Sequence, residues 1–251
     1  MYNYALARHY DALTANVNYP ARARYFHKLL GKYSDRPPRI LLDLACGTGS
    51  LSWEFSGMGY EVIGVDASTE MLSVAHVKAE RHPHTERPLF LCQRMEELDL
   101  YGSVDACVCA LDSVNHLPDT AALRAVFARV SLFLAPGGVF LFDVNTRYKH
   151  AAVLGNKAFV YETDGVVCVW RNAYHDKQGR VDISLDFFGP VGKGMYRRSS
   201  EYLSERIFTH RQLCTALDAA GLEMLAAHSE RTRPGKPAQR IVYAAGKPQC
   251  P

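Results

Sequence analysis

The chain has 251 residues, of which 48% are hydrophobic and 22% charged, and its formal net charge is +3. So weak a charge excludes the strongly basic surface by which many proteins bind nucleic acid or anionic membranes. No apolar run approaches the roughly 20 residues of a membrane-spanning helix, and the N-terminus has no secretory signal pattern.

Residues 1–36 are predicted to form a helical cap. Apolar residues recur at helical spacing from Tyr19 to Leu30. Pro37 and Pro38 then favour an extended linker, because proline restricts its own backbone and that of the residue before it. The cap is therefore expected to precede the first strand as a separate element.

From residue 37 onward, strands and helices alternate. Strands are expected over 39–44, 60–66, 88–93, 103–109, 138–144, 222–229 and 240–245. Helices are expected over 49–58, 69–82, 119–134 and 209–220, and Pro136-Gly137-Gly138 is a turn signal before the fifth strand. This alternation predicts a doubly wound α/β fold: a Rossmann-like, mostly parallel, seven-stranded sheet with helices on both faces.

Residues 147–205 differ from the rest of the chain. Four runs of β-forming residues follow one another without helical segments, and Asp-Gly, Gln-Gly and Gly-Lys-Gly turns separate them. We expect an antiparallel β insert that divides the α/β core into 37–146 and 206–251.

The seven cysteines show no paired metal-binding spacing. Their odd number favours reduced thiols in the cytoplasm over a disulfide framework. We therefore expect a cytoplasmic protein, and we expect no metal site.

A glycine turn follows the first strand, in the sequence Asp43-Leu44-Ala45-Cys46-Gly47-Thr48-Gly49. The second strand ends in a carboxylate, Asp66. A strand, a tight glycine turn, a helix and a second strand ending in an acidic residue are typical of a nucleotide-binding half, in which the carboxylate binds ribose hydroxyls. Ser52 stands where a dinucleotide fingerprint has its third glycine.

The position of Asp43 discriminates between cofactors. A carboxylate at the end of the first strand can hold a cationic α-amino group, which S-adenosylmethionine (SAM) has and NAD lacks. It would also repel the pyrophosphate of NAD. SAM is therefore the expected cofactor. An NAD-linked oxidoreductase and a non-catalytic SAM-binding module remain alternatives, since related sheets carry many functions.

These motifs resemble the class I SAM-dependent methyltransferases. The resemblance covers residues 40–50 and 62–72 and extends through 110–117 and 134–143. Tyr10-Asp11-Ala12-Leu13, with Tyr19, looks like the N-terminal cap of the bacterial YqeM-like small-molecule methyltransferases. This resemblance implies that the protein transfers the SAM methyl group to a small-molecule acceptor by in-line displacement. It also implies that the β insert forms part of the acceptor pocket.

By position, the resemblance also implies a cofactor site built from strand ends and the cap. Its members are Tyr10, Tyr19, Asp43, Ala45, Gly47, Gly49, Asp66, Ala67, Met71, Met95, Glu96 and Asp112. Arg94 stands where the family commonly has an acidic residue that accepts from the adenine amino group, and arginine cannot accept. On the cap, Arg22 or Arg24 is a candidate partner of the SAM carboxylate, although exposed arginines are common on amphipathic helices.

Four polar residues follow the fourth strand, at the edge where open α/β sheets bind ligands: Asp112, Ser113, Asn115 and His116. Histidine ordinarily titrates near neutrality, so His116 is the candidate general base. Alternatively, Asp112 and Asn115 brace the loop. The loop lacks the Asn/Asp-Pro-Pro-aromatic motif of base-amino methyltransferases, which disfavours nucleic acid as substrate. We expect no membrane partner, and a monomer or a homodimer.

Overall fold

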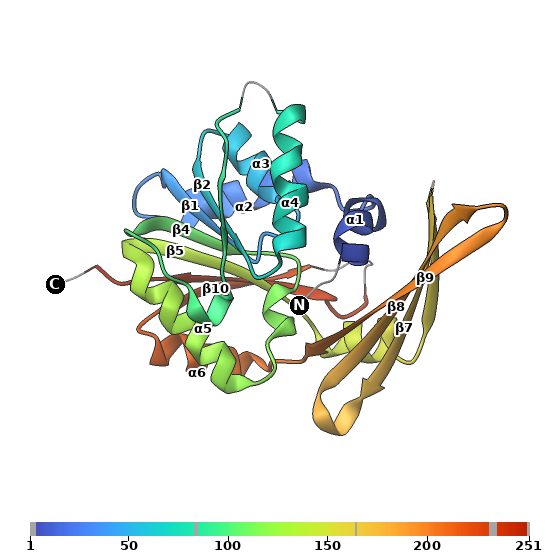
Figure 1. Cartoon of the computed structure of the whole chain (residues 1–251). Helices are drawn as coiled ribbons and strands as arrows, with labels where there is room; N and C mark the ends of the chain where they lie inside the picture. The colour runs from blue at the N-terminus through green and yellow to red at the C-terminus, as the bar shows by residue number, and fades with distance from the viewer. Residues whose placement is uncertain (1–3, 83–84, 164, 231–234, 250–251) are drawn as a thin grey trace.

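The computed structural model describes residues 4–82, 85–163, 165–230 and 235–249. It has a central sheet with helices on both faces and a second sheet at one side, with helix α1 (Tyr4–Leu13) between the two (Figure 1). None of the described helices has the length and apolarity required to cross a membrane.

The central sheet has seven strands in the order β10-β11-β5-β4-β1-β2-β3. Their bounds are β1 Ile40–Leu44, β2 Glu61–Asp66, β3 Leu89–Cys92, β4 Val104–Cys109, β5 Leu134–Asn145, β10 Glu223–Glu230 and β11 Arg240–Gly246. Strands β1 to β5 pair in parallel, whereas β11 is antiparallel to both β5 and β10. The predicted mostly parallel, seven-stranded sheet is confirmed.

Helices cover both faces of this sheet. The α-helices beyond α1 are α2 Tyr19–Tyr33, α3 Ser50–Gly57, α4 Thr69–Val77, α5 Thr120–Phe133 and α6 His210–Ala219. The short helices are η1 Lys78–Arg81, η2 Met95–Glu97, η3 Ser113–His116, η5 Asp176–Gln178 and the π-helix η4 Lys149–Leu154. Because side chains alternate along a strand, Leu42 and Leu44 of β1 join the apolar cluster of α5 and α6, while Leu41 joins that of α2 and α3.

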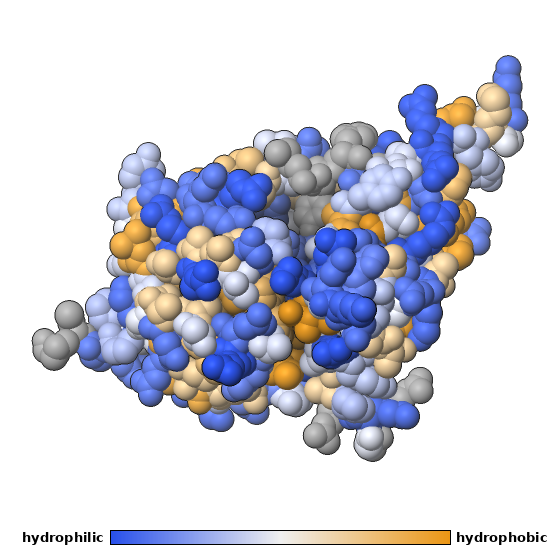
Figure 2. All heavy atoms as spheres, turned by 90° about the horizontal axis from the view of Figure 1, so that it is seen from below, coloured by the Kyte–Doolittle hydropathy of each residue, from blue (hydrophilic) through white to orange (hydrophobic). Residues whose placement is uncertain are grey.

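The insert forms an antiparallel sheet of four strands in chain order: β6 Ala158–Thr163, β7 Val166–His175, β8 Arg180–Gly192 and β9 Met195–Arg206. One of its faces is apolar and contains Val181, Ile183 and Phe187. Leu6 and Ala7 of α1 belong to the same apolar cluster. The cap helix therefore connects the insert to the core. Seen from below, the surface mixes hydrophilic and hydrophobic residues (Figure 2).

The insert, predicted to be free of helical segments, begins with the π-helix η4 before its first strand. Two elements of the core also differ from their predicted form. The helix expected over 69–82 ends as α4 at Val77 and continues as the 3-10 helix η1, a common way for helices to end. Strand β5 already begins at Leu134, and its register with β4 shifts across the predicted turn. A Cβ at Gly138 would lie 2.7 Å from the carbonyl oxygen of Asp105, so the bulge requires glycine at this point of close backbone approach.

Candidate active site

The site lies at the carboxyl edge of the central sheet. Strands β1 and β4 are neighbours, and the order of strands reverses between them, which is where open α/β sheets bind ligands. A cavity of about 520 Å³ is found at this edge. It is lined by Gly47 and Asp66 of the core, by His116 after β4 and by Arg206 of the insert.

Asp66 holds the glycine turn in place. Its Oδ2 accepts the N–H of Gly47 at 2.8 Å, and its Oδ1 accepts that of Ser68 at 2.9 Å. Burial raises the pKa of Asp66, although the N–H groups of Ser68 and Gly47 act in the opposite direction. Each carboxylate oxygen has a further lone pair, so Asp66 can still accept hydrogen bonds from a diol.

The two glycines of the turn serve different purposes. Both have positive φ, 55° at Gly47 and 69° at Gly49. A Cβ at Gly49 would lie 2.8 Å from the Phe90 ring, so this glycine is required for packing. A Cβ at Gly47 would meet no protein atom within 4 Å, and Gly47 lines the cavity. The turn thus brings bare backbone to the cavity at Gly47.

Asp43 is a buried carboxyl group, with 2% of its surface exposed. Burial raises its pKa to about 7, opposed by a hydrogen bond from Ser52 Oγ at 2.5 Å and reinforced by the charge of Asp66. The serine that replaces the third fingerprint glycine therefore binds Asp43. Asp43 has no cationic partner among the described residues, and such a buried carboxylate is suited to an ammonium group, so the donor set fits the amino-acid part of SAM.

The cap contributes two tyrosines to the site. Tyr10 lines the large cavity and, with Tyr19 and Asp43, a smaller one of about 30 Å³. The hydroxyl of Tyr19 donates to Thr14 Oγ1 at 2.9 Å, and burial raises the pKa of Tyr19. Both predicted cap residues therefore lie beside the glycine turn.

A polar cluster that sequence reasoning missed fastens the cap to this turn. The ammonium of Lys78, whose side chain is largely buried, lies 2.8 Å from Asp11 Oδ2 and also donates to Thr48 Oγ1 at 3.0 Å and Ser50 Oγ at 2.6 Å. Thr48 donates to Asp11 Oδ1 at 2.6 Å. We call these four residues the cap cluster. Burial lowers the pKa of Lys78, while Asp11 raises it.

Most of the predicted site residues come together. Those that line the large cavity are Tyr10, Ala45, Gly47, Asp66, Ala67, Met71, Met95, Glu96 and His116, and the smaller cavity adds Tyr19 and Asp43. Gly49 and Asp112 line neither cavity. Arg94 lies in the wall and pairs with Glu96 at 3.1 Å, so the one acidic residue predicted for the adenine edge already has a cationic partner.

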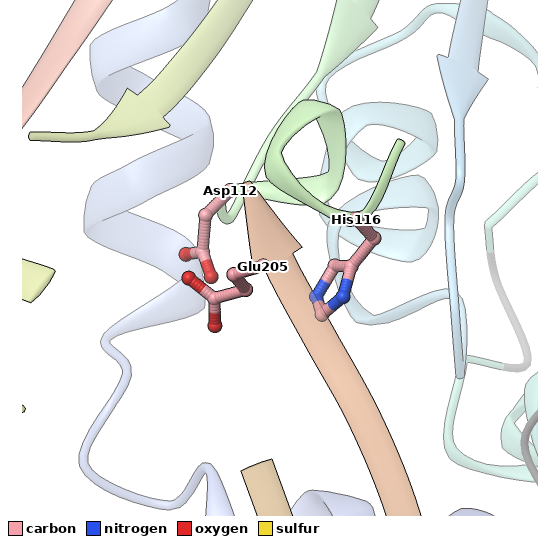
Figure 3. A group of neighbouring side chains, drawn as sticks. All are labelled: Asp112, His116 and Glu205. Carbon is pink, nitrogen blue, oxygen red and sulfur yellow. The ribbon is translucent and has the colours of Figure 1, made fainter. Parts of the chain in front are cut away.

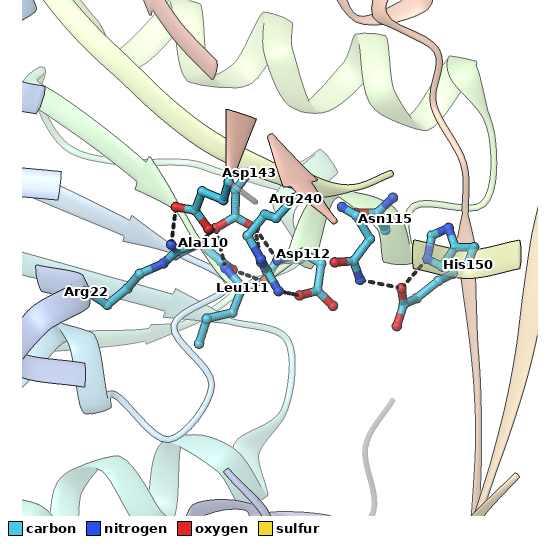
Figure 4. Close-up of polar contacts among 12 residues, drawn as sticks. Arg22, Ala110, Leu111, Asp112, Asn115, Asp143, His150 and Arg240 are labelled. Atoms are coloured by element: carbon cyan, nitrogen blue, oxygen red, sulfur yellow. Dashed lines mark hydrogen bonds and ion pairs between the residues drawn. The ribbon is translucent and has the colours of Figure 1, made fainter. Parts of the chain in front are cut away.

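A network of buried charges lies behind the site (Figure 4). Asp143 is fully buried; it binds Arg22 at 2.7 Å and forms a close ion pair with Arg240, which also pairs with Asp112. Arg22 binds Glu230 at 2.5 Å as well. Although burial raises the pKa of Asp143, Arg240 and Arg22 lower it below the ordinary value. The candidate Arg22 thus has two carboxylate partners, and neither it nor Arg24 lines either cavity.

The same network shapes the loop after β4. Leu111 and Asp112 both have left-handed backbone, and their N–H groups donate to the Asp143 carboxylate at 3.0 and 2.6 Å. The buried amide of Asn115 accepts from the N–H of Asn145 at 2.8 Å and donates to the carbonyl of Arg206 at 2.7 Å. The bracing role that we considered for Asp112 and Asn115 is confirmed by these contacts.

His116 lies next to two carboxylates. Asp112, His116 and Glu205 place one ligand atom each within 4.8 Å of one another (Figure 3). Glu205 is buried, and its Oε2 contacts His150 Nε2 at 2.7 Å and Asn145 Nδ2 at 2.9 Å. Burial raises the pKa of Glu205, but His150 and the charge of His116 lower it further than burial raises it.

Among the described residues, Asp112, His116 and Glu205 are also the candidate ligands of a metal ion, because their ligand atoms lie close together. One oxygen of Asp112 is already bound to Arg240, and one of Glu205 to His150. An oxygen that already binds Arg240 or His150 is occupied and does not offer its lone pair to a metal ion. Glu205 could not be predicted from the sequence, because it lies in a β-rich run and no neighbouring residue in the chain indicates a site.

The doubly wound sheet, with a glycine turn, two buried carboxylates at the strand ends and a helical cap over them, defines a class I SAM-dependent methyltransferase. Residues 41–138 match the family model of a methyltransferase domain. YqeM of Bacillus subtilis (strain 168) is 30% identical over 241 residues, which cover 95% of this chain and 94% of that protein. The chain therefore belongs to the YqeM-like group of this family.

Solved structures agree with this assignment. A SAM-dependent methyltransferase from Clostridium acetobutylicum ATCC 824 is 30% identical, with a TM-score of 0.83 and 96% coverage of both chains. The sugar N-methyltransferase KedS8 from Streptoalloteichus sp ATCC 53650 has the same fold, with a TM-score of 0.76 at 22% identity over 96% of this chain and 93% of that one. SAM is the cofactor of this enzyme, and the NAD-linked alternative is set aside.

Proposed function

We propose that this enzyme methylates a small-molecule acceptor that binds between η3 and the β insert. The large cavity carries this proposal, because Gly47 and Asp66 of the core, His116 of η3 and Arg206 of the insert all line it. A cavity of about 520 Å³ lies within the range of small-ligand sites. The fold of a sugar N-methyltransferase is compatible with such an acceptor.

Within the cofactor site, we assign the ribose hydroxyls to Asp66 and the α-amino group to Asp43. Both carboxylates are buried at the ends of neighbouring strands. Gly47 would bring its backbone against the amino-acid part, and Tyr10 and Tyr19 would cover it from the cap. Gly49 supports the turn through packing rather than contact.

When bound, SAM supplies a methyl group on a sulfonium, a leaving group that is already activated, for in-line displacement. The residues of the chain then need to orient the acceptor, exclude water and accept a proton if the acceptor carries one. His116 is in place for that proton, next to the carboxylate of Glu205. We propose a cytoplasmic setting, where thiols such as those of the six described free cysteines stay reduced.

Calorimetric titration of SAM into the wild type and Asp66→Ala tests the cofactor site. We expect the variant to lose at least roughly 100-fold in affinity, because two charge-assisted hydrogen bonds to the ribose disappear. Asp99→Ala, which removes an exposed carboxylate, is the matched control and should bind SAM like the wild type. Equal affinities for Asp66→Ala and the wild type would overturn the assignment.

Transfer of labelled methyl from SAM to a metabolite extract then distinguishes an enzyme from a SAM-binding module. A labelled small molecule that forms with the wild type and not with Asp66→Ala supports the proposed function. Tight SAM binding without any labelled small molecule would favour the non-catalytic alternative.

A further inference from the structure

Three arginines line the large cavity, and they differ in how their charges are balanced. Arg94 and Arg180 each pair with an acidic residue two positions further along the chain, at 3.1 and 2.9 Å. The guanidinium of Arg206 instead donates to the carbonyl oxygen of Pro118 at 3.2 Å. Within the described part of the chain it has no carboxylate within ion-pair distance.

The charge of Arg206 also acts on Asp119, but the two form no ion pair among the described residues. The Asp119 carboxylate caps α5 instead, where its Oδ1 accepts the N–H groups of Ala121 and Ala122 at 2.8 and 2.9 Å. Of five guanidinium N–H donors, the contact with Pro118 uses one. A half-buried cation with several remaining donors therefore borders the cavity.

Arg206 is also held in a defined place relative to His116. It is the last residue of β9, and its backbone carbonyl accepts the buried amide of Asn115, the residue that precedes His116. Its side chain contacts Pro118, two residues after His116. Arg206 is thus held through its backbone by Asn115 and through its side chain by Pro118, the residues that flank His116 in the chain, which lowers the entropy lost when the guanidinium binds a ligand.

The acidic residues of the cavity wall are at the cofactor side. Asp66 holds the glycine turn, and Glu96 follows β3 and pairs with Arg94. The insert side presents Arg180 and Arg206 together with polar Tyr202. An acceptor with a negative group would match this distribution of charge, because guanidinium binds carboxylate and phosphate through paired hydrogen bonds.

We propose that Arg206 binds an anionic group, a carboxylate or a phosphate, on the methyl acceptor, and that the atom to be methylated lies beside His116. The inference rests on the proposed function and adds to it the chemical class of the acceptor. Arg180, on the adjacent strand, stays paired with its acidic neighbour Asp182, so the proposal rests on Arg206 alone.

The product of the labelled-methyl reaction tests this class directly. The labelled small molecule is applied to an anion exchanger near pH 7, with and without prior phosphatase treatment. We expect it to be retained; release by phosphatase would identify a phosphate, and persistent retention a carboxylate. A labelled product that the exchanger does not retain would overturn the inference and leave the proposed function intact. If no labelled product forms at all, the proposed function itself is contradicted.

Anion binding gives a second readout that does not depend on turnover. The full chain, loaded with S-adenosylhomocysteine, is titrated with pyrophosphate and with citrate. We expect Arg206→Gln to weaken binding of whichever anion the wild type binds more tightly, roughly 10- to 100-fold. Arg206→Lys should weaken it less, since lysine keeps the positive charge but lacks the paired N–H donors of the guanidinium.

Arg197→Gln is the matched control, because Arg197 is an exposed arginine on the same strand, β9, outside the cavity. It should bind the anion like the wild type. Thermal unfolding and the affinity for S-adenosylhomocysteine should be equal in all variants, which separates loss of the anion contact from loss of the fold. The inference would be contradicted if Arg206→Gln bound each anion as tightly as the wild type does, or if the wild type bound neither anion.

Discussion

Asp43 couples cofactor binding to pH. Its pKa of about 7 results chiefly from burial, so the free enzyme carries it partly protonated near neutrality. The ammonium of SAM favours the ionised form. Affinity for SAM should therefore be greatest above about pH 7 and fall as the pH falls through that value.

The substitution Asp43→Asn tests this coupling. We expect weaker SAM binding, roughly tenfold or more, and the loss of its dependence on pH between about 6 and 8. Because the folded-state pKa is raised, the wild type without ligand loses stability as pH rises through about 7; the variant should not. Calorimetry and thermal unfolding across this range measure both effects. An affinity that does not change with pH in the wild type would argue against the assignment of Asp43.

Glu205 is expected to stabilise the fold as an ionised carboxylate. Although burial raises its pKa, the hydrogen bond to His150 and the charge of His116 lower that pKa below its ordinary value. The stability that this group contributes is therefore present above the ordinary glutamate pKa and is lost as the pH falls through the lowered folded-state pKa. The neutral amide in Glu205→Gln should lower the melting temperature near pH 7 and flatten its fall at acidic pH, which thermal unfolding across pH measures. Glu162→Gln, an exposed position on the same insert, should change neither, and a Glu205→Gln variant that melts like the wild type near pH 7 would contradict this role.

At the scale of elements, the cap cluster determines how firmly α1 covers the glycine turn. In Asp11→Asn the largely buried Lys78 loses its carboxylate partner. We expect a lower melting temperature and faster dissociation of SAM, by roughly several-fold, since the neutral amide still forms one hydrogen bond. Stopped-flow measurement of SAM release reports the second effect.

The double variant Asp11→Asn/Lys78→Met is the control for this prediction. Removing both charges leaves no unpaired ammonium, so part of the stability lost in the single variant should return. If Asp11→Asn alone releases SAM at the wild-type rate, the cap cluster does not hold the cap on the cofactor.

How much of the site could be predicted depended on the distance between partners in the chain. Asp43, Gly47 and Asp66 belong to one strand-turn-helix-strand segment, and the pattern of this segment can be recognised in the sequence. The Lys78–Asp11 pair joins positions 67 apart, and the Asn145–Glu205 contact positions 60 apart. Periodicity gives the type of each element but does not state which side chains meet across elements.

At the scale of the molecule, the alternation of strands and helices was sufficient to predict the core, because parallel strands need helical crossovers. The insert was predicted as a set of antiparallel strands. How it is oriented relative to the core could not be predicted. That orientation depends on Leu6 and Ala7 of α1, which pack on its apolar face, and on Asn115, which joins it to the core. Neither contact leaves a local sequence signal.

The bond from Asn115 to Arg206 has a consequence for how this enzyme can diversify. It joins a loop that follows the cofactor-binding strands to a strand that begins some 80 residues later, at Met195. Because the Asn115 amide binds the backbone carbonyl of Arg206 and not its side chain, side chains on β8 and β9 can be exchanged while the insert keeps its position on the core. New substrates become accessible through changes in the insert alone, without renewed selection for methyl-donor recognition.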